Sequence, residues 1–200
     1  MELELLSARL VLRPLTLDDL SLSIELWTDG DVVEYICEPL TEAEVEREMP
    51  TTIRRGANGS IGIWSVRDRA THESYGSVFL LPLPAEQDDT DWDLVDEAIP
   101  VEYEVEIGYV LKKTAWGKGI ATEAAGRLLR FAFESTTLEE IVAVIDHENA
   151  GSAKVLHKIG LEETGDRRAY ASNCLGFRVT RAEWLKRTSG RQSAPNTATT

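Results

Sequence analysis

The sequence lacks the features that define several whole classes of protein. No run approaches the roughly 18 apolar residues of a membrane-spanning helix, and the opening residues MELELLSARLVLR are acidic where a secretory signal has basic residues. Cysteine occurs only as Cys37 and Cys174, which are far apart and lack metal-binding spacing. We therefore expect a cytoplasmic protein with two free thiols, no bound metal and no membrane association.

Basic residues are also scarce. The chain has 21 Lys and Arg against 35 Asp and Glu, a formal net charge of −14, and its first lysine is Lys112. Nucleic-acid binding needs a basic surface that neutralises phosphates, so this composition argues against a nucleic-acid partner. It suits a cationic partner or adaptation to a salty cytosol, and composition alone does not choose between them.

At 200 residues, the chain has the length of one domain. Alternating apolar residues predict strands at 8–15, 60–68, 74–83, 102–111 and 139–146, and a last strand or hairpin within 165–179. Helical spacing and capping residues predict helices at 15–29, 42–55, about 120–134, 152–160 and 181–187. The irregular alternation of strands and helices favours an α+β fold with a mixed sheet.

Two further segments are set apart by composition. Residues 188–200 have few apolar side chains, so we expect a disordered tail after a domain that spans 1–187. Residues 84–100, PAEQDDTDWDLVDEAIP, are acidic and lie between prolines. That segment is either a solvated surface loop or an acidic rim beside a substrate site.

The stretch WGKGIATEAAG at 116–126 places two glycines directly before a predicted helix. Glycine is unfavourable inside a helix, so Gly117 and Gly119 indicate a loop whose backbone passes close to a ligand. The unpaired N–H groups at a helix N-terminus favour an anion such as phosphate. Neither the dinucleotide pattern, whose third glycine is here Thr122, nor the P-loop pattern matches.

Residues 106–133, EIGYVLKKTAWGKGIATEAAGRLLRFAF, resemble the acetyl-CoA-binding core of the GNAT acetyltransferases. Their pattern Q/R-x-x-G-x-G/A is matched by WGKGIA except at Trp116, a replacement typical of the RimJ/RimL-like N-terminal acetyltransferases of ribosomal proteins. That branch is also similar at RLVLRPLTLDD, NAGSAKVLHKIGL and FRVTRAEW, which begin at residues 9, 149 and 177. The resemblance therefore spans about 7–187 in collinear order.

The resemblance implies a single GNAT-type domain with a central, twisted, mixed but mostly antiparallel sheet flanked by helices. It implies direct transfer of the acetyl group of acetyl-CoA to a primary amine, either a protein N-terminus or a small amine. Coenzyme A would lie against Tyr109, Val110, Leu111, Trp116, Gly117, Lys118, Gly119, Ile120, Ala121, Thr122 and Asn149. Lys118 is either a phosphate contact or a solvated side chain. The protein would be a monomer or a homodimer.

Catalysis requires a base for the amine and an acid for the leaving thiolate. By resemblance Glu106 is the base, with Glu104 as the reserve candidate two residues away. The usual tyrosine acid is replaced by Leu156. Ser152 then becomes the candidate acid, unless it or Asn149 only caps the helix, and Tyr170 is a third candidate.

The missing tyrosine leaves a second function open, that of a non-catalytic, acyl-CoA-binding regulatory domain. Glu106, Ser152 and Asn149 favour the enzyme instead.

Overall fold

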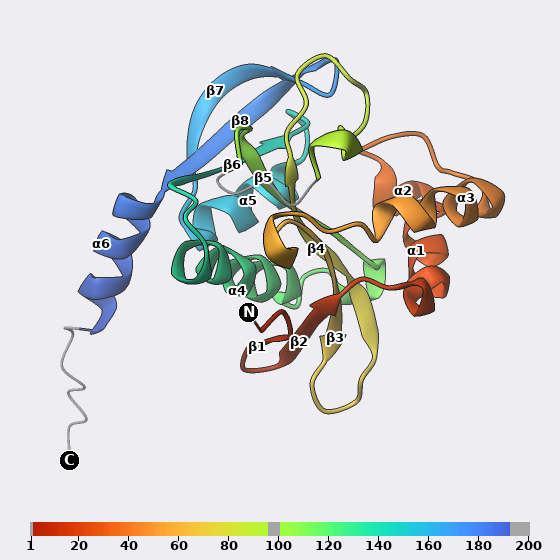
Figure 1. The fold of residues 1–200 in the computed structure, drawn as a ribbon, viewed down its shortest axis with the longest axis horizontal. Helices are drawn as coiled ribbons and strands as arrows, with labels where there is room; N and C mark the ends of the chain where they lie inside the picture. The colour runs from red at the N-terminus through yellow and green to blue at the C-terminus, as the bar shows by residue number, and fades with distance from the viewer. Residues whose placement is uncertain (1, 96–100, 193–200) are drawn as a thin grey trace.

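A computed structural model describes residues 2–95 and 101–192 and arranges them around an eight-stranded sheet (Figure 1). The strands are β1 (Leu5–Leu6), β2 (Leu10–Pro14), β3 (Gly62–Asp68), β4 (Ser74–Pro82), β5 (Val105–Leu111), β6 (Glu140–Ile145), β7 (Glu162–Ala169) and β8 (Ser172–Thr180). Their spatial order is β1-β2-β3-β4-β5-β6-β8-β7. Neighbouring strands are antiparallel except β5 and β6, which are parallel. The predicted α+β fold with a mixed, mostly antiparallel sheet is confirmed.

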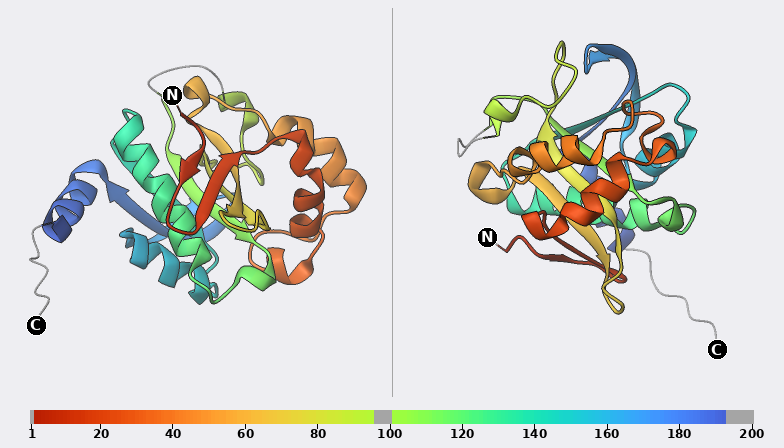
Figure 2. Two further views of the ribbon diagram at one scale, coloured as in Figure 1. Left: turned by 90° about the horizontal axis from the view of Figure 1, so that it is seen from below. Right: turned by 90° about the vertical axis from the view of Figure 1, so that its right-hand side faces the viewer.

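Helices cover both faces of this sheet (Figure 2). They are α1 (Leu20–Trp27), α2 (Gly30–Val33), α3 (Glu42–Thr52), α4 (Ile120–Ser135), α5 (Ala150–Ile159) and α6 (Arg181–Gln192), and short 3₁₀ turns occupy Leu17–Asp19, Ala57–Gly59, Trp92–Leu94 and Lys113–Ala115. On one face α1 packs against β4 and α3, and on the other α4 packs against β4, β5 and α5. The apolar stripe of α4 is buried as its spacing predicts, at Ile120, Ala124, Leu128 and Phe131.

The two faces of β5 contact different helices because side chains alternate along a strand. Ile107 and Leu111 join the large core cluster that includes α4, whereas Val110 packs with Leu22 and Leu26 of α1. Glu106 shares the parity of Val110, so it lies on the face toward α1. The two faces of β5 therefore belong to separate environments.

The C-terminal end differs from the prediction. Helix α6 continues to Gln192, so residues 188–192 are helical and not part of a tail. Its start is capped where the Thr180 N–H donates to Glu183 Oε2 at 2.8 Å and the Glu183 N–H donates to Thr180 Oγ1 at 3.3 Å. Trp184 packs against Phe133 with ring centroids 5.6 Å apart. These contacts anchor a helix whose last residues have little apolar character. Residues 193–200, and the part of the acidic segment at 96–100, lie outside the described residues.

Both cysteines have free thiols, as predicted, with Cys37 exposed and Cys174 partly buried on β8. Within the part of the chain that the structure describes, no helix has the length and apolar character needed to span a membrane.

Candidate functional site

The glycine loop, residues 116–119, connects the turn after β5 to the first residue of α4. Gly117 and Gly119 have φ values of 69° and 76°, the left-handed region that favours glycine. A Cβ at Gly117 would meet nothing within 4 Å, and one at Gly119 would meet only the Arg9 side chain at 3.6 Å. Backbone conformation, not crowding within the chain, therefore requires glycine here, and the space over the loop is open to a ligand.

The first turn of α4 faces this open space without a side-chain cap. Gly119 is the N-cap residue and has no side chain to accept a hydrogen bond. The leading N–H groups of α4 thus lack the carboxylate or hydroxyl partner that caps most helices. Together with the helix dipole they form a site suited to a phosphate group.

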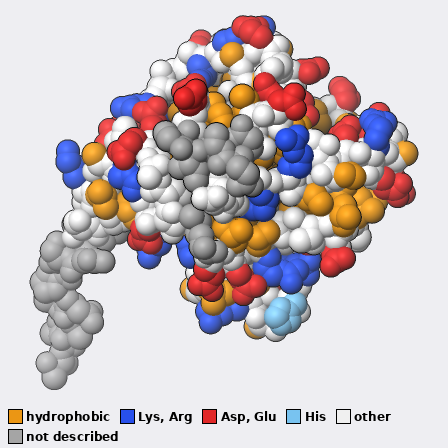
Figure 3. All heavy atoms as spheres, viewed as in Figure 1, with side chains coloured by type: hydrophobic (Ala, Val, Ile, Leu, Met, Phe, Trp, Pro, Cys, Tyr) orange, Lys and Arg blue, Asp and Glu red, His pale blue; other side chains and the backbone are white. Residues whose placement is uncertain are grey.

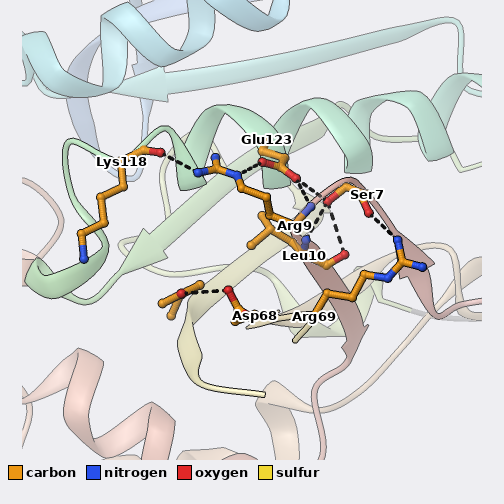
Figure 4. Close-up of polar contacts among 8 residues, drawn as sticks. Ser7, Arg9, Leu10, Asp68, Arg69, Lys118 and Glu123 are labelled. Atoms are coloured by element: carbon orange, nitrogen blue, oxygen red, sulfur yellow. Dashed lines mark hydrogen bonds and ion pairs between the residues drawn. The ribbon is translucent and has the colours of Figure 1, made fainter. Parts of the chain in front are cut away.

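Arg9 fastens the glycine loop to the turn between β1 and β2 (Figure 4). Its Nη1 donates to the Lys118 carbonyl at 3.1 Å, and its Nε donates to Glu123 Oε2 at 2.7 Å. Ser7 Oγ donates to the other carboxylate oxygen of Glu123 at 2.8 Å. Burial alone would raise the pKa of Glu123, but a hydrogen bond from the Arg9 backbone N–H, together with those from Ser7 and the Arg9 side chain, outweighs it and holds the pKa below its usual value.

The Arg9 contacts were not predicted from the sequence, although Arg9 belongs to the quoted segment RLVLRPL. They leave the Lys118 side chain free to extend away from Arg9, along the loop (Figure 4). Glu123 would otherwise place a negative charge beside the anion site, and Arg9 compensates that charge. The loop is therefore both fixed in position and kept attractive to anions.

Trp116 braces the loop from its other side. Its indole Nε1 donates to the carbonyl of Leu111 at 2.8 Å, which ties the loop to the end of β5. The residue is still 49% exposed, so part of it is available to a ligand.

Strands β5 and β6 diverge beside the glycine loop. On one edge β5 pairs with β4 along its whole length, from Val105 to Leu111. On the other edge, within the described residues, β5 and β6 are in register at a single position, Glu106 opposite Val142. Among the described residues, the β6 side of the main chain at 109–111, predicted to contact coenzyme A, thus has no register pairing with β6. We call this unpaired stretch the β5–β6 gap, and an extended ligand can pair with it as an added strand.

Glu106 is buried at the point where the two strands separate. Its exposed fraction is 4%, and Tyr170 Oη donates to Glu106 Oε2 at 2.6 Å. Burial raises the pKa of Glu106 to about 7, against the opposing effects of the Tyr170 hydroxyl, the Val144 backbone N–H and Arg167. A carboxyl group with this pKa exchanges protons readily near neutral pH.

Glu104, the reserve candidate, lies in a different environment. Its side chain is 51% exposed and is paired with Arg167, whose Nη2 lies 2.7 Å from Glu104 Oε2. Its pairing with Arg167 on the surface separates it from the buried environment of Glu106.

Helix α5 presents Ser152 toward the opposite face of β5. Asn149 is the N-cap of α5, and its Oδ1 accepts from the Ser152 backbone N–H at 2.9 Å. Tyr109 Oη donates to the Ser152 carbonyl at 3.2 Å, and burial raises the pKa of Tyr109 to about 12. Asn149 therefore caps the helix. The Ser152 hydroxyl is not needed as the cap and is available for another role.

The predicted residues thus form two groups beside the β5–β6 gap, one on each face of the sheet. The glycine loop, Tyr109, Asn149 and Ser152 lie toward α4 and α5, and Glu106 lies toward α1 and the β7–β8 turn. Tyr170 joins Glu106 instead of Ser152. Such an arrangement can admit one reactant from each face of the sheet.

Comparisons with known proteins agree with this geometry. A family model described as an acetyltransferase (GNAT) domain matches residues 9–162. The uncharacterised N-acetyltransferase p20 of Bacillus licheniformis is 29% identical over 168 residues, which cover 83% of this chain and 86% of the relative.

Two solved structures share the fold. A GNAT-family acetyltransferase from Bacillus anthracis has a TM-score of 0.69 and 20% identity, covering 90% of this chain and 99% of that one. A spermidine N-acetyltransferase from Vibrio cholerae, in complex with CoA and spermine, has a TM-score of 0.68 and 19% identity, with coverages of 90% and 99%. The chain belongs to the GNAT acetyltransferase family.

Proposed function

We propose that this acetyltransferase moves the acetyl group of acetyl-CoA directly to a primary amine, either a protein N-terminus or a small amine. The observation that carries the proposal is Glu106, a buried carboxyl with a pKa of about 7 at the mouth of the β5–β6 gap. A non-catalytic binding domain has no need for a proton acceptor there.

The residues present suit coenzyme A. The N–H groups at 117–121 are available to its pyrophosphate, and the main chain at 109–111 to its pantetheine arm. Acetyl-CoA supplies a thioester, which is an activated acyl group. Its phosphates are neutralised by the α4 dipole and by Lys118, with Arg9 holding the loop in place.

The chemistry then divides between the two faces of β5. Glu106 takes the proton from the ammonium form of the acceptor, and the free amine attacks the carbonyl carbon. A backbone N–H near Val110 stabilises the oxyanion, and Ser152 donates a hydrogen bond to the departing sulfur. As the carbon–sulfur bond breaks, the nitrogen of the adduct loses its extra proton and the departing sulfur gains one, which releases coenzyme A as a thiol and leaves an amide.

We further propose that the chain belongs to the RimJ/RimL-like branch and acts in the cytoplasm. Trp116 at the first position of the glycine motif supports the branch. Its indole hydrogen bond to the Leu111 carbonyl gives Trp116 a structural role. The net charge of −14 favours a cationic acceptor. The solved relative that holds spermine offers one example of such an acceptor in this fold.

The test is turnover of acetyl-CoA with a panel of acceptors: polyamines, amino sugars, amino acids, and peptides with free N-termini. Thiol release and the mass of the product are followed together. We expect at least one amine to gain an acetyl group. If coenzyme A binds but no amine in the panel is acetylated, the regulatory, acyl-CoA-binding function is the better description.

A further inference from the structure

Tyr170 and Glu106 form a partly buried hydrogen bond between positions 64 residues apart in sequence. The two oxygens lie 2.6 Å apart, and Glu106 is 4% exposed, so water does not compete effectively for this bond. A neutral phenol that donates to a buried carboxylate makes a short, strong hydrogen bond. The hydrogen bond from Tyr170 therefore has more influence on the proton affinity of Glu106 than an exposed contact would have.

The backbone at Tyr170 is unusual for its residue type. Tyr170 and Ala171 form the two-residue turn between β7 and β8, with φ values of 50° and 51°. Such turns ordinarily use Asn and Gly, because left-handed backbone is unfavourable for larger residues. A tyrosine keeps this conformation only when its surroundings hold it.

Contacts from the start of the acidic segment hold the turn. The Tyr170 N–H donates to the Pro84 carbonyl at 3.2 Å, and the Ala171 N–H donates to the Ala85 carbonyl at 3.1 Å. The β7–β8 turn is thus fixed by two backbone hydrogen bonds at one side and by the Glu106 carboxylate at the other. Segments from three parts of the chain converge to place one phenol.

Other groups also lie around Glu106. Arg167 on β7 is already paired with Glu104, whereas the Val144 N–H of β6 hydrogen-bonds the Glu106 carboxyl directly and also lowers its pKa. Cys174 on β8 is a thiol whose pKa is raised by burial and by Glu106, so it is neutral. Burial and Glu106, with a smaller contribution from Asp89, raise the pKa of the Tyr170 phenol, and a hydrogen bond with the Thr90 side chain opposes them. Tyr170 is therefore a protonated donor in contact with the carboxylate.

We propose that Tyr170 is a positioning residue for Glu106: its hydroxyl binds Oε2 and leaves Oε1 to receive the proton of the acceptor ammonium. The N–H bond of the ammonium breaks, an O–H bond forms at Oε1, and the phenol keeps its own proton. The catalytic consequence rests on the proposed function, whereas the hydrogen bond and its effect on Glu106 do not.

The experiment measures the pKa of Glu106 by NMR of its side-chain carboxyl carbon, assigned with Glu106→Gln. Tyr170→Phe removes only the hydroxyl, and we expect the pKa to rise by about one unit, the size of one hydrogen bond to a charged group. Tyr75→Phe is the matched control, because Tyr75 Oη donates to Asp68 Oδ2 at 3.1 Å on the β3–β4 hairpin. It should leave the pKa of Glu106 unchanged.

A second variant covers the case in which Tyr170→Phe does not fold. Replacing Tyr170 by 3-fluorotyrosine keeps the shape and makes the hydroxyl a stronger donor, so the pKa of Glu106 should fall. In acetyl-CoA turnover, the rising limb of kcat/KM against pH should move with the measured pKa in each variant.

A Glu106 pKa that is the same in wild type and fluorotyrosine protein, or in wild type and a folded Tyr170→Phe, would overturn the proposal. Because the titration needs neither acetyl-CoA nor acceptor, this outcome is separate from failure of the proposed function. That failure would appear as coenzyme A binding without acetylation of any amine in the panel.

Discussion

The glycine loop and the environment of Glu106, to which we assign parts of the same proposed reaction, are built in opposite ways. The loop at 116–119 and the α4 N-terminus are contiguous in sequence, and their chemistry comes from backbone N–H groups. Glu106 depends on a side chain from the β7–β8 turn and on backbone contacts at 84–85. A binding site made of local backbone tolerates change around it, whereas a tuned carboxyl depends on distant segments.

The largest expected effect tests the Glu106 side of this comparison. Glu106→Gln keeps size and hydrogen bonding but cannot accept a proton, so we expect kcat/KM at pH 7 to fall by about 10²-fold or more. Coenzyme A affinity should be little changed. Steady-state kinetics with an accepted amine provides the measurement.

The pH dependence has a definite sign. Only the ionised carboxylate is a base, so wild-type kcat/KM should rise with pH through about 7, the pKa of Glu106. The deficit of Glu106→Gln should shrink at high pH, where the free amine is already abundant. Glu104→Gln is the control, since Glu104 is exposed and paired with Arg167. Normal turnover by Glu106→Gln, together with loss of turnover in Glu104→Gln, would show that the base is Glu104 and not Glu106.

A smaller effect is expected at Ser152, on the opposite face of β5. Ser152→Ala should reduce kcat by about tenfold, because a thiol is an acceptable leaving group without full protonation. Ser152→Thr restores the hydroxyl and should recover part of the loss. In wild type and both variants, Asn149 Oδ1 still accepts from the backbone N–H of residue 152 and caps α5. The melting temperature should therefore be the same in all three proteins. Full activity in Ser152→Ala would remove Ser152 from the chemistry.

The smallest effect concerns the support of the glycine loop. Arg9→Gln removes the guanidinium contacts with the Lys118 carbonyl and Glu123, so coenzyme A affinity should fall by about threefold to tenfold. Arg69→Gln is the matched control from the same region, because Arg69 donates to the Ser7 carbonyl and does not reach the loop (Figure 4). Equal affinities in the two variants would separate Arg9 from cofactor binding.

The sequence predicts the structure of the glycine loop and α4 better than the surroundings of Glu106, for a physical reason. Gly117 and Gly119 indicate left-handed backbone before a helix, and the apolar spacing after them predicts α4. Both signals are local in sequence. The contact between Tyr170 and Glu106 depends on register between β7 and β8 and on docking of that turn at 84–85. No short-range pattern encodes those pairings.

The surface view illustrates the same limit. Acidic and basic side chains intermingle on the face shown in Figure 3, although the chain carries a net charge of −14. Composition gave the sign of the total charge but not its distribution. The Arg9–Glu123 contact was not predicted, because nothing in the sequence indicates that two charged residues 114 positions apart lie side by side.

The most direct test of the account is calorimetry of coenzyme A binding to wild type, Gly119→Glu and Gly165→Glu. Gly165 on β7 also has a left-handed φ, 86°, with nothing within 4 Å of an added Cβ, so both variants carry similar strain and the same added charge. We predict that Gly119→Glu loses at least about tenfold in affinity, or about 1.4 kcal/mol, while Gly165→Glu binds like wild type. Wild-type affinity in folded Gly119→Glu, or equal losses in both variants, would contradict a coenzyme A site at the glycine loop.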